Sequence, residues 1–187
     1  MIPSQEAINA LNQVRGDAVV VATMTGRLFW SQVSQRKDLD IPLIGCMGKA
    51  SSIGLGVAVA RPDKRVLVID GDGGLLMNLG SLVTIANKAP DNLVHVLLQD
   101  GVYTTTGGQP VPSPSNLSFA GIAKEAGITE SYEFDNLEDF VTQLDEMLQK
   151  KGPIFICLKV QHTEEPPASK DNFAEGLHTV AETLSKE

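Results

Sequence analysis

The sequence has few of the residues that build disulfide frameworks and metal clusters. Cysteine occurs only at Cys46 and Cys157, and no Cys-x-x-C pair is present. A zinc ribbon, iron–sulfur ligation and a disulfide scaffold are therefore poorly supported, and two buried free thiols are expected instead. No apolar run approaches the ~20 residues of a membrane span. The first residues also lack the basic start and apolar stretch of a signal peptide, so we expect a cytoplasmic protein.

Positive charge is scarce as well. The chain has 15 basic and 23 acidic residues, a formal net charge of -8, and no run of lysine or arginine. This balance argues against an electrostatic nucleic-acid binder and favours a small-molecule ligand or a protein partner. With 187 residues, 42% of them hydrophobic, the chain can bury one substantial core. We expect a single domain over residues 1–187, in which 163–187 form a linker and a C-terminal helix.

Apolar runs alternate with segments of helical spacing along the chain. Strands are predicted at 18–22, 41–44, 66–69, 93–98 and 154–160. Helices are predicted at 5–14, 28–35, 48–60, 119–126, 137–148 and 170–184, and a further crossover helix opens at Gly73 and Gly74 and reaches residue 86. Thr25 and Gly26 form a turn, and 104–115 form a long loop without periodicity. The alternation predicts an α/β fold, a doubly wound parallel sheet in three layers, α/β/α.

Two aspartates follow neighbouring apolar strands. Asp72 lies in the sequence Asp-Gly-Asp-Gly-Gly at 70–74, and Asp100 lies in Gln-Asp-Gly-Val-Tyr at 99–103. Each alone would be an ordinary turn residue, because Asp-Gly is a common turn dipeptide. If the two strands are adjacent, however, both carboxylates lie at one edge of the sheet, where ligands of α/β proteins bind. Together they predict a site for a divalent cation, with a phosphate against Gly73 and Gly74.

Three better-known motifs do not fit these glycines. The Gly-Lys at 48–49 is followed by Ala50, where a P-loop requires Ser or Thr. The glycines at 71–74 do not have the G-x-G-x-x-G spacing of a dinucleotide-binding loop. No G-x-S-x-G follows a strand, so a serine hydrolase of that type is not indicated.

Three blocks in order, residues 44–56, 68–82 and 105–109, carry a more specific likeness. With Gly-Asp-Gly after one strand and the Asp100 turn after the next, the chain resembles the diphosphate-binding domain of the thiamine diphosphate enzymes. The likeness is greatest to the β subunits of sulfopyruvate decarboxylases and to the corresponding half of phosphonopyruvate decarboxylases. It implies thiamine diphosphate and Mg²⁺ as cofactors.

The resemblance also implies roles for individual residues. Asp72 and Asp100 would bind Mg²⁺ through their side chains, and Val102 would do so through its backbone carbonyl; six oxygen ligands suit this ion. Around the metal, the diphosphate would meet the Gly-Asp-Gly loop and the turn that closes over it, which comprise Gly71, Gly73, Gly74, Tyr103, Thr104 and Thr105. Met47 would support the thiazolium ring, Gly45 would accept from the 4′-amino group, and Thr25 and Gly26 would touch the diphosphate.

One position departs from the family pattern. Asp100 stands where the family usually has Asn, which makes the cation cluster more negative by one charge. Amides, helix dipoles or a cation such as Lys49 would have to offset it; the alternative is weaker cofactor affinity or a preference for a different divalent ion. We expect that Mg²⁺ still binds, and that replacing Asp100 by Asn preserves or tightens cofactor binding.

Thiamine catalysis needs a glutamate against the pyrimidine ring, and in the family it belongs to a second domain. No glutamate here has the required context, so the resemblance implies a pyrimidine-binding α subunit in a hetero-oligomer, α2β2 or larger. The implied reaction is decarboxylation of a 2-oxo acid, with sulfopyruvate as the leading substrate. Carboligation, another 2-oxo acid and a non-catalytic partner subunit stay open.

Further polar residues have two readings. Thr104, Thr105, Thr106 and Gln109 either hydrogen-bond the substrate or bond their own loop. His95 is expected as a satisfied core residue, and His162 and His178 as exposed residues without a catalytic role.

Overall fold

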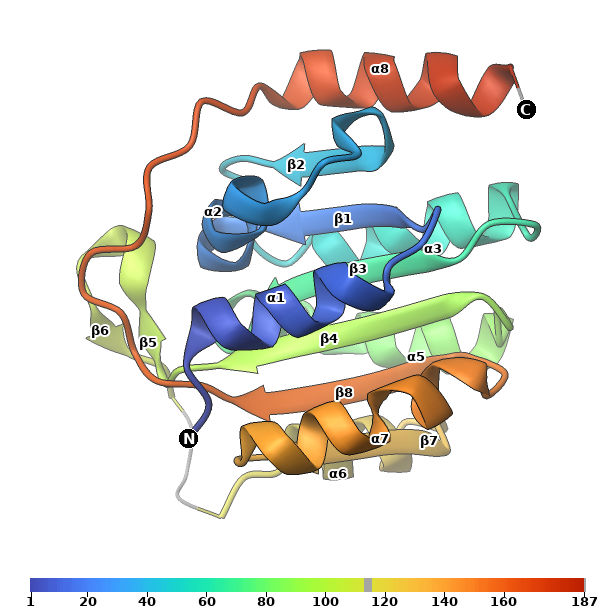
Figure 1. Cartoon of the computed structure of the whole chain (residues 1–187). Coiled ribbons are helices and arrows are strands. Elements are labelled where there is room, and N and C mark those ends of the chain that lie inside the picture. Colours follow the sequence, from blue (N-terminus) through green and yellow to red (C-terminus); the bar gives the residue numbers. More distant parts are fainter. Residues whose placement is uncertain (113–115, 187) are drawn as a thin grey trace.

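A computed structural model of the chain describes residues 1–112 and 116–186. Its centre is a six-stranded, wholly parallel sheet in the order β2-β1-β3-β4-β8-β7 (Figure 1). The strands are β1 (Val19–Thr23), β2 (Asp40–Leu43), β3 (Val66–Gly71), β4 (Leu93–Gln99), β7 (Glu130–Phe134) and β8 (Ile154–Lys159). Because all of them run in one direction, their carboxyl ends meet at the same edge.

Helices cover both faces of the sheet, which confirms the predicted doubly wound α/β/α architecture. The helices α1 (Ser4–Val14), α2 (Met24–Val33) and α7 (Leu137–Gln149) pack on one face. The other face is covered by α3 (Ala50–Ala60), α4 (Asp72–Leu76), α5 (Gly80–Lys88) and α6 (Phe119–Glu125). The last helix, α8 (Phe173–Ser185), lies along the edge strand β2. Within the part of the chain that the structure describes, no helix is long and apolar enough to cross a membrane.

Two helices, α3 and α8, begin later than the sequence predicts. Gly48 has a φ of +74°, which a helix cannot accommodate, so α3 begins at Ala50. The Asn172 side chain accepts from the amides of Ala174 and Glu175 and caps α8, which therefore begins at Phe173. Conversely, α2 already begins at Met24, so Thr25 and Gly26 lie in its first turn and do not form a separate turn.

The predicted crossover helix after β3 is two helices. The chain leaves α4 through bonds from the amides of Met77 and Asn78 to carbonyls three residues back. The Asn78 side chain donates to the Gly48 carbonyl at 2.8 Å and to Ser52 Oγ at 3.2 Å, which anchors the break beside the loop before α3. The hydrophobic spacing did not reveal this interruption, because Leu75 and Leu76 before the break and Leu79 after it pack against the same core cluster.

The segment at 104–115, predicted as an irregular loop, contains regular structure. Val102–Tyr103 (β5) pairs antiparallel with Gln109–Pro110 (β6), and Thr104–Thr106 form a short 3-10 helix (η2) between them. A second short 3-10 helix, η1 (Lys37–Leu39), precedes β2. Residues 113–115 of the predicted loop lie outside the described residues. Strand β7 was not predicted, because it pairs only with β8 and lacks a continuous apolar run.

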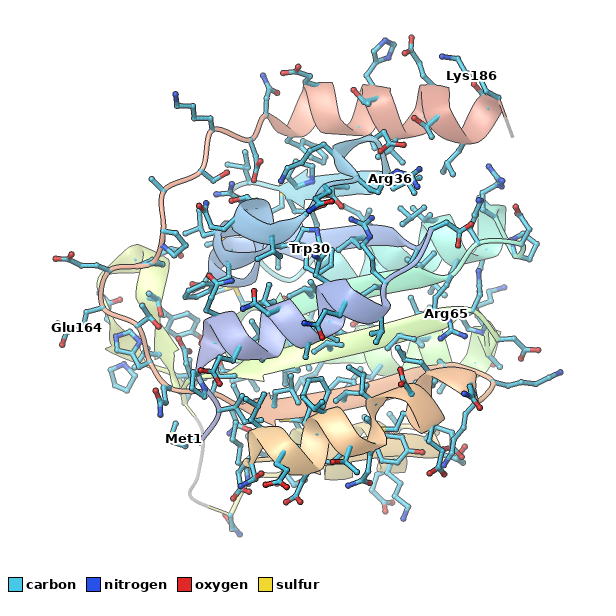
Figure 2. All side chains as sticks on the ribbon, viewed as in Figure 1. Met1, Trp30, Arg36, Arg65, Glu164 and Lys186 are labelled. Atoms are coloured by element: carbon cyan, nitrogen blue, oxygen red, sulfur yellow. The ribbon has the colours of Figure 1, made fainter. Side chains whose placement is uncertain are left out.

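A buried ion pair joins three elements near the β2 edge. Arg15, after α1, donates to Asp40 Oδ1 of β2 at 3.0 Å, and Trp30 Nε1 of α2 donates to the same oxygen at 3.0 Å. The guanidinium also lies over the Trp30 ring, 5.2 Å from its centre. Trp30, labelled in Figure 2, is a buried residue of α2, whereas Arg36 and Glu164 are exposed.

Candidate active site

The carboxyl ends of β1, β3, β4 and β8 surround a small cavity of about 40 Å³. Twelve of the thirteen residues predicted to hold the cofactor line this cavity, and the two predicted metal-ligand side chains are among them. They are Thr25, Gly26, Met47, Gly71, Asp72, Gly73, Gly74, Asp100, Val102, Tyr103, Thr104 and Thr105. Gly45 does not line it; this residue is exposed and has a φ of +68°. The parallel sheet therefore brings together residues that are up to 80 positions apart in the sequence (from 25 to 105).

Four further residues line the cavity and were not predicted: Ser4, Met24, Leu98 and Val160. Met24 adjoins the predicted Thr25, and its φ of +48° is uncommon for a residue other than glycine. Ser4 reaches the cavity because the first residues are tied to the end of β8: the Ile2 amide donates to the Lys159 carbonyl at 2.9 Å. No local sequence pattern signals this long-range contact.

Asp72 is buried, and its carboxylate is held by the backbone. Gly73 N donates to Oδ1 at 2.8 Å, and Gly101 N donates to Oδ2 at 2.9 Å. The second bond links the loop after β3 to the loop after β4. Burial raises the pKa of Asp72 to about 6, the two amides oppose this rise, and the negative charge of Asp100 adds to it. A cation beside Asp72 would offset both the burial and the repulsion.

Asp100 lies at the rim of the cavity and is held by one backbone amide and one side-chain hydroxyl. Its Oδ1 accepts from Val102 N at 3.2 Å, and its Oδ2 accepts from Thr104 Oγ1 at 2.9 Å. Nδ1 of His162 lies 3.5 Å from the same Oδ2. Lys49 was expected as a possible counter-charge, but it is exposed at the start of α3 and forms no ion pair with Asp100 within residues 1–112 and 116–186.

The two carboxylates fit a hard divalent cation. Each ionised carboxylate oxygen keeps a free lone pair beside the hydrogen bond that it accepts, and oxygen ligands are what Mg²⁺ prefers. Among the described residues no group of three or more His, Cys, Asp or Glu side chains could hold a metal. The remaining ligands of an ion at Asp72 and Asp100 would therefore be backbone carbonyls, such as that of Val102, water or a bound phosphate.

The glycines at the site allow close packing. A Cβ on Gly73 would lie 2.4 Å from Tyr103 Cε1, so the tyrosine ring covers this part of the backbone. A Cβ on Gly74 would lie 2.8 Å from Asp70 Oδ1. Glycine at both positions lets the loop pass between the Tyr103 ring and the buried Asp70.

Asp70 and His95 form a buried pair beneath the loop. His95 Nε2 lies 3.6 Å from Asp70 Oδ2, and the two side chains are 1% and 0% exposed. His95 is in the core, as predicted, and its ring meets the edge of Phe155. It is not the satisfied residue that was expected, since neither ring nitrogen has a hydrogen-bond partner among the described residues.

The predicted polar loop residues differ in their surroundings. Thr104 bonds Asp100, and Thr106 Oγ1 donates to the Tyr103 carbonyl at 3.3 Å, so both serve their own loop. Thr105 lines the cavity, and Gln109 is exposed in β6. His178 is exposed on α8, as expected.

A larger cavity of about 560 Å³ lies between α2, β2 and the start of α8. It contains none of the residues predicted for cofactor or metal binding. We assign the candidate site to the smaller cavity, because only there do the carboxyl ends of the central strands, the glycine-rich loop and both aspartates meet.

Comparison with known proteins identifies the family of the chain. The model of the family described as "Thiamine pyrophosphate enzyme, C-terminal TPP binding domain" matches residues 19–158, which include both aspartates. The chain belongs to the thiamine pyrophosphate enzymes. The expected family is thus confirmed.

Two relatives illustrate how this thiamine pyrophosphate enzyme domain is used elsewhere. A phosphonopyruvate decarboxylase of Streptomyces hygroscopicus is 41% identical over 67% of the chain, which spans only 31% of that protein's length. The sulfopyruvate decarboxylase subunit beta of Methanothermobacter thermautotrophicus is 36% identical over 86% of the chain and 83% of its own length. The chain thus corresponds to part of the first relative and to most of the second.

A solved structure shows the same fold. The thiamine diphosphate-dependent 4-hydroxybenzoylformate decarboxylase of Rhodococcus jostii RHA1 superposes with a TM-score of 0.74 at 22% identity, over 87% of this chain and 33% of that one. The thiamine pyrophosphate enzyme fold is therefore confirmed for this chain.

Proposed function

We propose that the chain is the diphosphate-binding β subunit of a carboxy-lyase, a 2-oxo acid decarboxylase that depends on thiamine diphosphate and Mg²⁺. The observation that carries this proposal is that Asp72 and Asp100 lie beside a glycine-rich loop. The two turns are joined there, because the amide of Gly101, the residue after Asp100, donates to Asp72 Oδ2 at 2.9 Å. Relatives named as phosphonopyruvate and sulfopyruvate decarboxylases support the reaction class. The β-subunit relative favours sulfopyruvate, with sulfoacetaldehyde and CO₂ as products.

The chain's residues would hold the cofactor by its diphosphate. Asp72, Asp100 and the Val102 carbonyl would bind Mg²⁺, the loop amides would face the phosphate oxygens, and Met47 would support the ring system. The bound cofactor supplies the electron sink that accepts the pair released with CO₂. Asp72 is suited to its part because its two amide bonds fix the carboxylate before any metal arrives.

A second chain would complete the site. The cavity of about 40 Å³ is far smaller than the roughly 300–1,000 Å³ of a typical small-molecule pocket, so this chain encloses only part of a cofactor's surroundings. We propose an α subunit with a pyrimidine-binding domain that supplies the activating glutamate. The relative's name, "subunit beta", supports a partner of this kind.

The test starts from the assembled protein. The chain is tagged, recovered with any partner from its own cells, and assayed for CO₂ release from sulfopyruvate, phosphonopyruvate and pyruvate. We expect release that requires thiamine diphosphate and Mg²⁺, is fastest with sulfopyruvate, and is absent for the isolated chain. Full turnover by the chain alone would contradict the shared site.

Substitution distinguishes catalysis from mere copurification. Asp72→Asn should abolish cofactor-dependent CO₂ release, whereas Asp145→Asn, an exposed carboxylate on α7, should leave it unchanged. Acyloin products would instead indicate a carboligase. Failure of the assembly to bind thiamine diphosphate would favour a non-catalytic subunit.

A further inference from the structure

His162 contacts the outer side of the candidate metal site. It follows β8, and its Nδ1 lies 3.5 Å from Asp100 Oδ2 and 3.4 Å from Thr104 Oγ1. Asp100 and Thr104 both line the cavity, whereas His162 does not. The imidazole therefore touches the carboxylate from behind and does not face the space where a cofactor would lie.

The fold fixes the position of this histidine. Immediately before it, Val160 N donates to the Gln99 carbonyl at 3.0 Å, and Gln161 N donates to the Ile2 carbonyl at 2.9 Å. The backbone that carries His162 is thus bonded to the residue that precedes Asp100. The imidazole side chain is 33% exposed, and the Asp100 carboxylate is 13% exposed.

The neighbours of Nδ1 determine which ring nitrogen carries the proton. Thr104 donates its only hydroxyl proton to Asp100 Oδ2, so its oxygen offers lone pairs to the ring. An ionised carboxylate also only accepts. Both contacts are favourable when Nδ1 bears the hydrogen, and a neutral imidazole in that tautomer is sufficient to form them.

We propose that His162 is a positioning residue that holds the Asp100 carboxylate in the orientation in which it binds the divalent cation. This inference rests on the proposed function. Backbone amides fix both oxygens of Asp72. At Asp100 the Val102 amide bonds only Oδ1, and Oδ2 depends on the side chains of Thr104 and His162. Replacing a group that orients a metal ligand in this way commonly weakens metal binding.

The test measures metal affinity in the assembled protein. Mn²⁺ binding in the presence of thiamine diphosphate is followed by electron paramagnetic resonance for the unmodified chain and three variants. His162→Ala should weaken Mn²⁺ binding about tenfold, the lower end of the usual range for such residues, because the ring is partly exposed. His162→Asn should keep most of the affinity, since its amide donor lies where Nδ1 does. His162→Gln places its donor where Nε2 lies and should behave like His162→Ala.

Controls separate a positioning role from a general loss of structure. His178→Ala removes an exposed histidine on α8 and should change neither Mn²⁺ affinity nor the melting temperature. The metal-free melting temperature of His162→Ala should match that of this control. A clear fall below it would overturn the proposal, as would equal affinities for His162→Ala and the unmodified chain, or a failure of His162→Asn to retain affinity.

The outcomes also separate this inference from the proposed function. If the unmodified assembly binds no Mn²⁺ with thiamine diphosphate, the proposed function fails and His162 has no metal ligand to position. If the unmodified assembly binds and the His162 variants do not differ from it, only the positioning role fails.

Discussion

The two aspartates of the candidate site are held in physically different ways. Asp72 is buried and bonded by two backbone amides, whereas Asp100 lies at the rim and is bonded by one backbone amide, that of Val102, and by the Thr104 side chain beside His162. An asparagine offers one acceptor oxygen and two N–H donors. It therefore conflicts with the paired amides at Asp72, but it can be accommodated among the side chains around Asp100.

This difference predicts opposite effects of the same substitution. Asp72→Asn leaves one of two buried amides without an acceptor, which typically costs about 1–3 kcal/mol, and it removes a metal-binding charge. Asp100→Asn removes one negative charge from the cluster and should preserve or tighten binding. Titration calorimetry with thiamine diphosphate and Mg²⁺ measures both variants in the assembled protein. A complete loss of binding in Asp100→Asn would contradict this prediction.

The two cysteines should differ in reactivity. Burial raises the pKa of the Cys157 thiol to about 12, and the side chain is fully buried. At pH 8 only roughly one thiol in ten thousand with such a pKa is ionised, and the thiolate is the reactive form. Iodoacetamide should therefore label the native chain only at Cys46, which is partly exposed, and label both after unfolding. Peptide mass spectrometry checks this, and native labelling of Cys157 would contradict it.

Local sequence patterns together with the family resemblance predicted most of the residues that line the cavity, because the Gly-Asp-Gly loop and the Asp100 turn are contiguous and each follows an apolar strand. It did not predict His162, Ser4 or Val160, which approach the site through pairing of distant segments. The contact at Ile2 and Val160 joins positions 2 and 160, and neither residue belongs to a recognisable motif. Gly45 was predicted from its family position and does not line the cavity.

Helix α3 has a face of small residues that brings it close to the sheet. A Cβ on Gly54 would lie 2.2 Å from Val68 Cγ2 of β3, whereas a Cβ on Gly56 would meet nothing within 4 Å. Val68 is β-branched, so its side chain has little freedom to move aside. The distance between α3 and β3 therefore depends on glycine at one position and not at the other.

The two glycines provide a matched pair of substitutions. Gly54→Ala should destabilise the chain, because overpacking typically costs about 1–3 kcal/mol and exceeds the gain in helix propensity of up to about 1 kcal/mol. Gly56→Ala should be neutral or stabilising, by up to about 1 kcal/mol. Urea unfolding measures both, and adding Val68→Ala to Gly54→Ala should recover part of the loss. Equal effects of the two alanines would refute the packing argument.

Elements were predicted well where a residue pattern coincided with complete burial. The central strands β1, β3, β4 and β8 have apolar runs because both of their faces are covered. The break between α4 and α5 was missed, since it depends on the Asn78 side chain bonding the Gly48 carbonyl across the structure. Strand β7 was missed because an edge strand with polar residues lacks such a run.

At the scale of the whole molecule, the buried ion pair couples the first two helices to the edge of the sheet. Arg15 and Asp40 have side-chain exposures of 5% and 9%, so neither charge can be solvated if its partner is lost. Asp40→Ala should therefore destabilise the chain by about 3–5 kcal/mol, the usual cost of an unpaired buried charge.

A nearby exposed pair provides the control for this prediction. Asp38 pairs with Arg36, and both side chains are more than a third exposed. Asp38→Ala should have a much smaller effect, because water and salt screen that pair. Denaturant unfolding of the two variants makes the comparison, and similar losses would argue against a special role for the buried pair.

The pairing of the first residues with the end of β8 determines where added polypeptide would emerge. Ser4 lines the cavity, Ile2 is bonded to Lys159 and Gln161, and Met1 is 66% exposed at the same end of the sheet. The end of α8 lies on the opposite side of the molecule (Figure 1). A purification tag or fused protein placed before Met1 would begin a few residues from the candidate site and should compete with the proposed α subunit. The same fusion placed after α8 would leave that approach open.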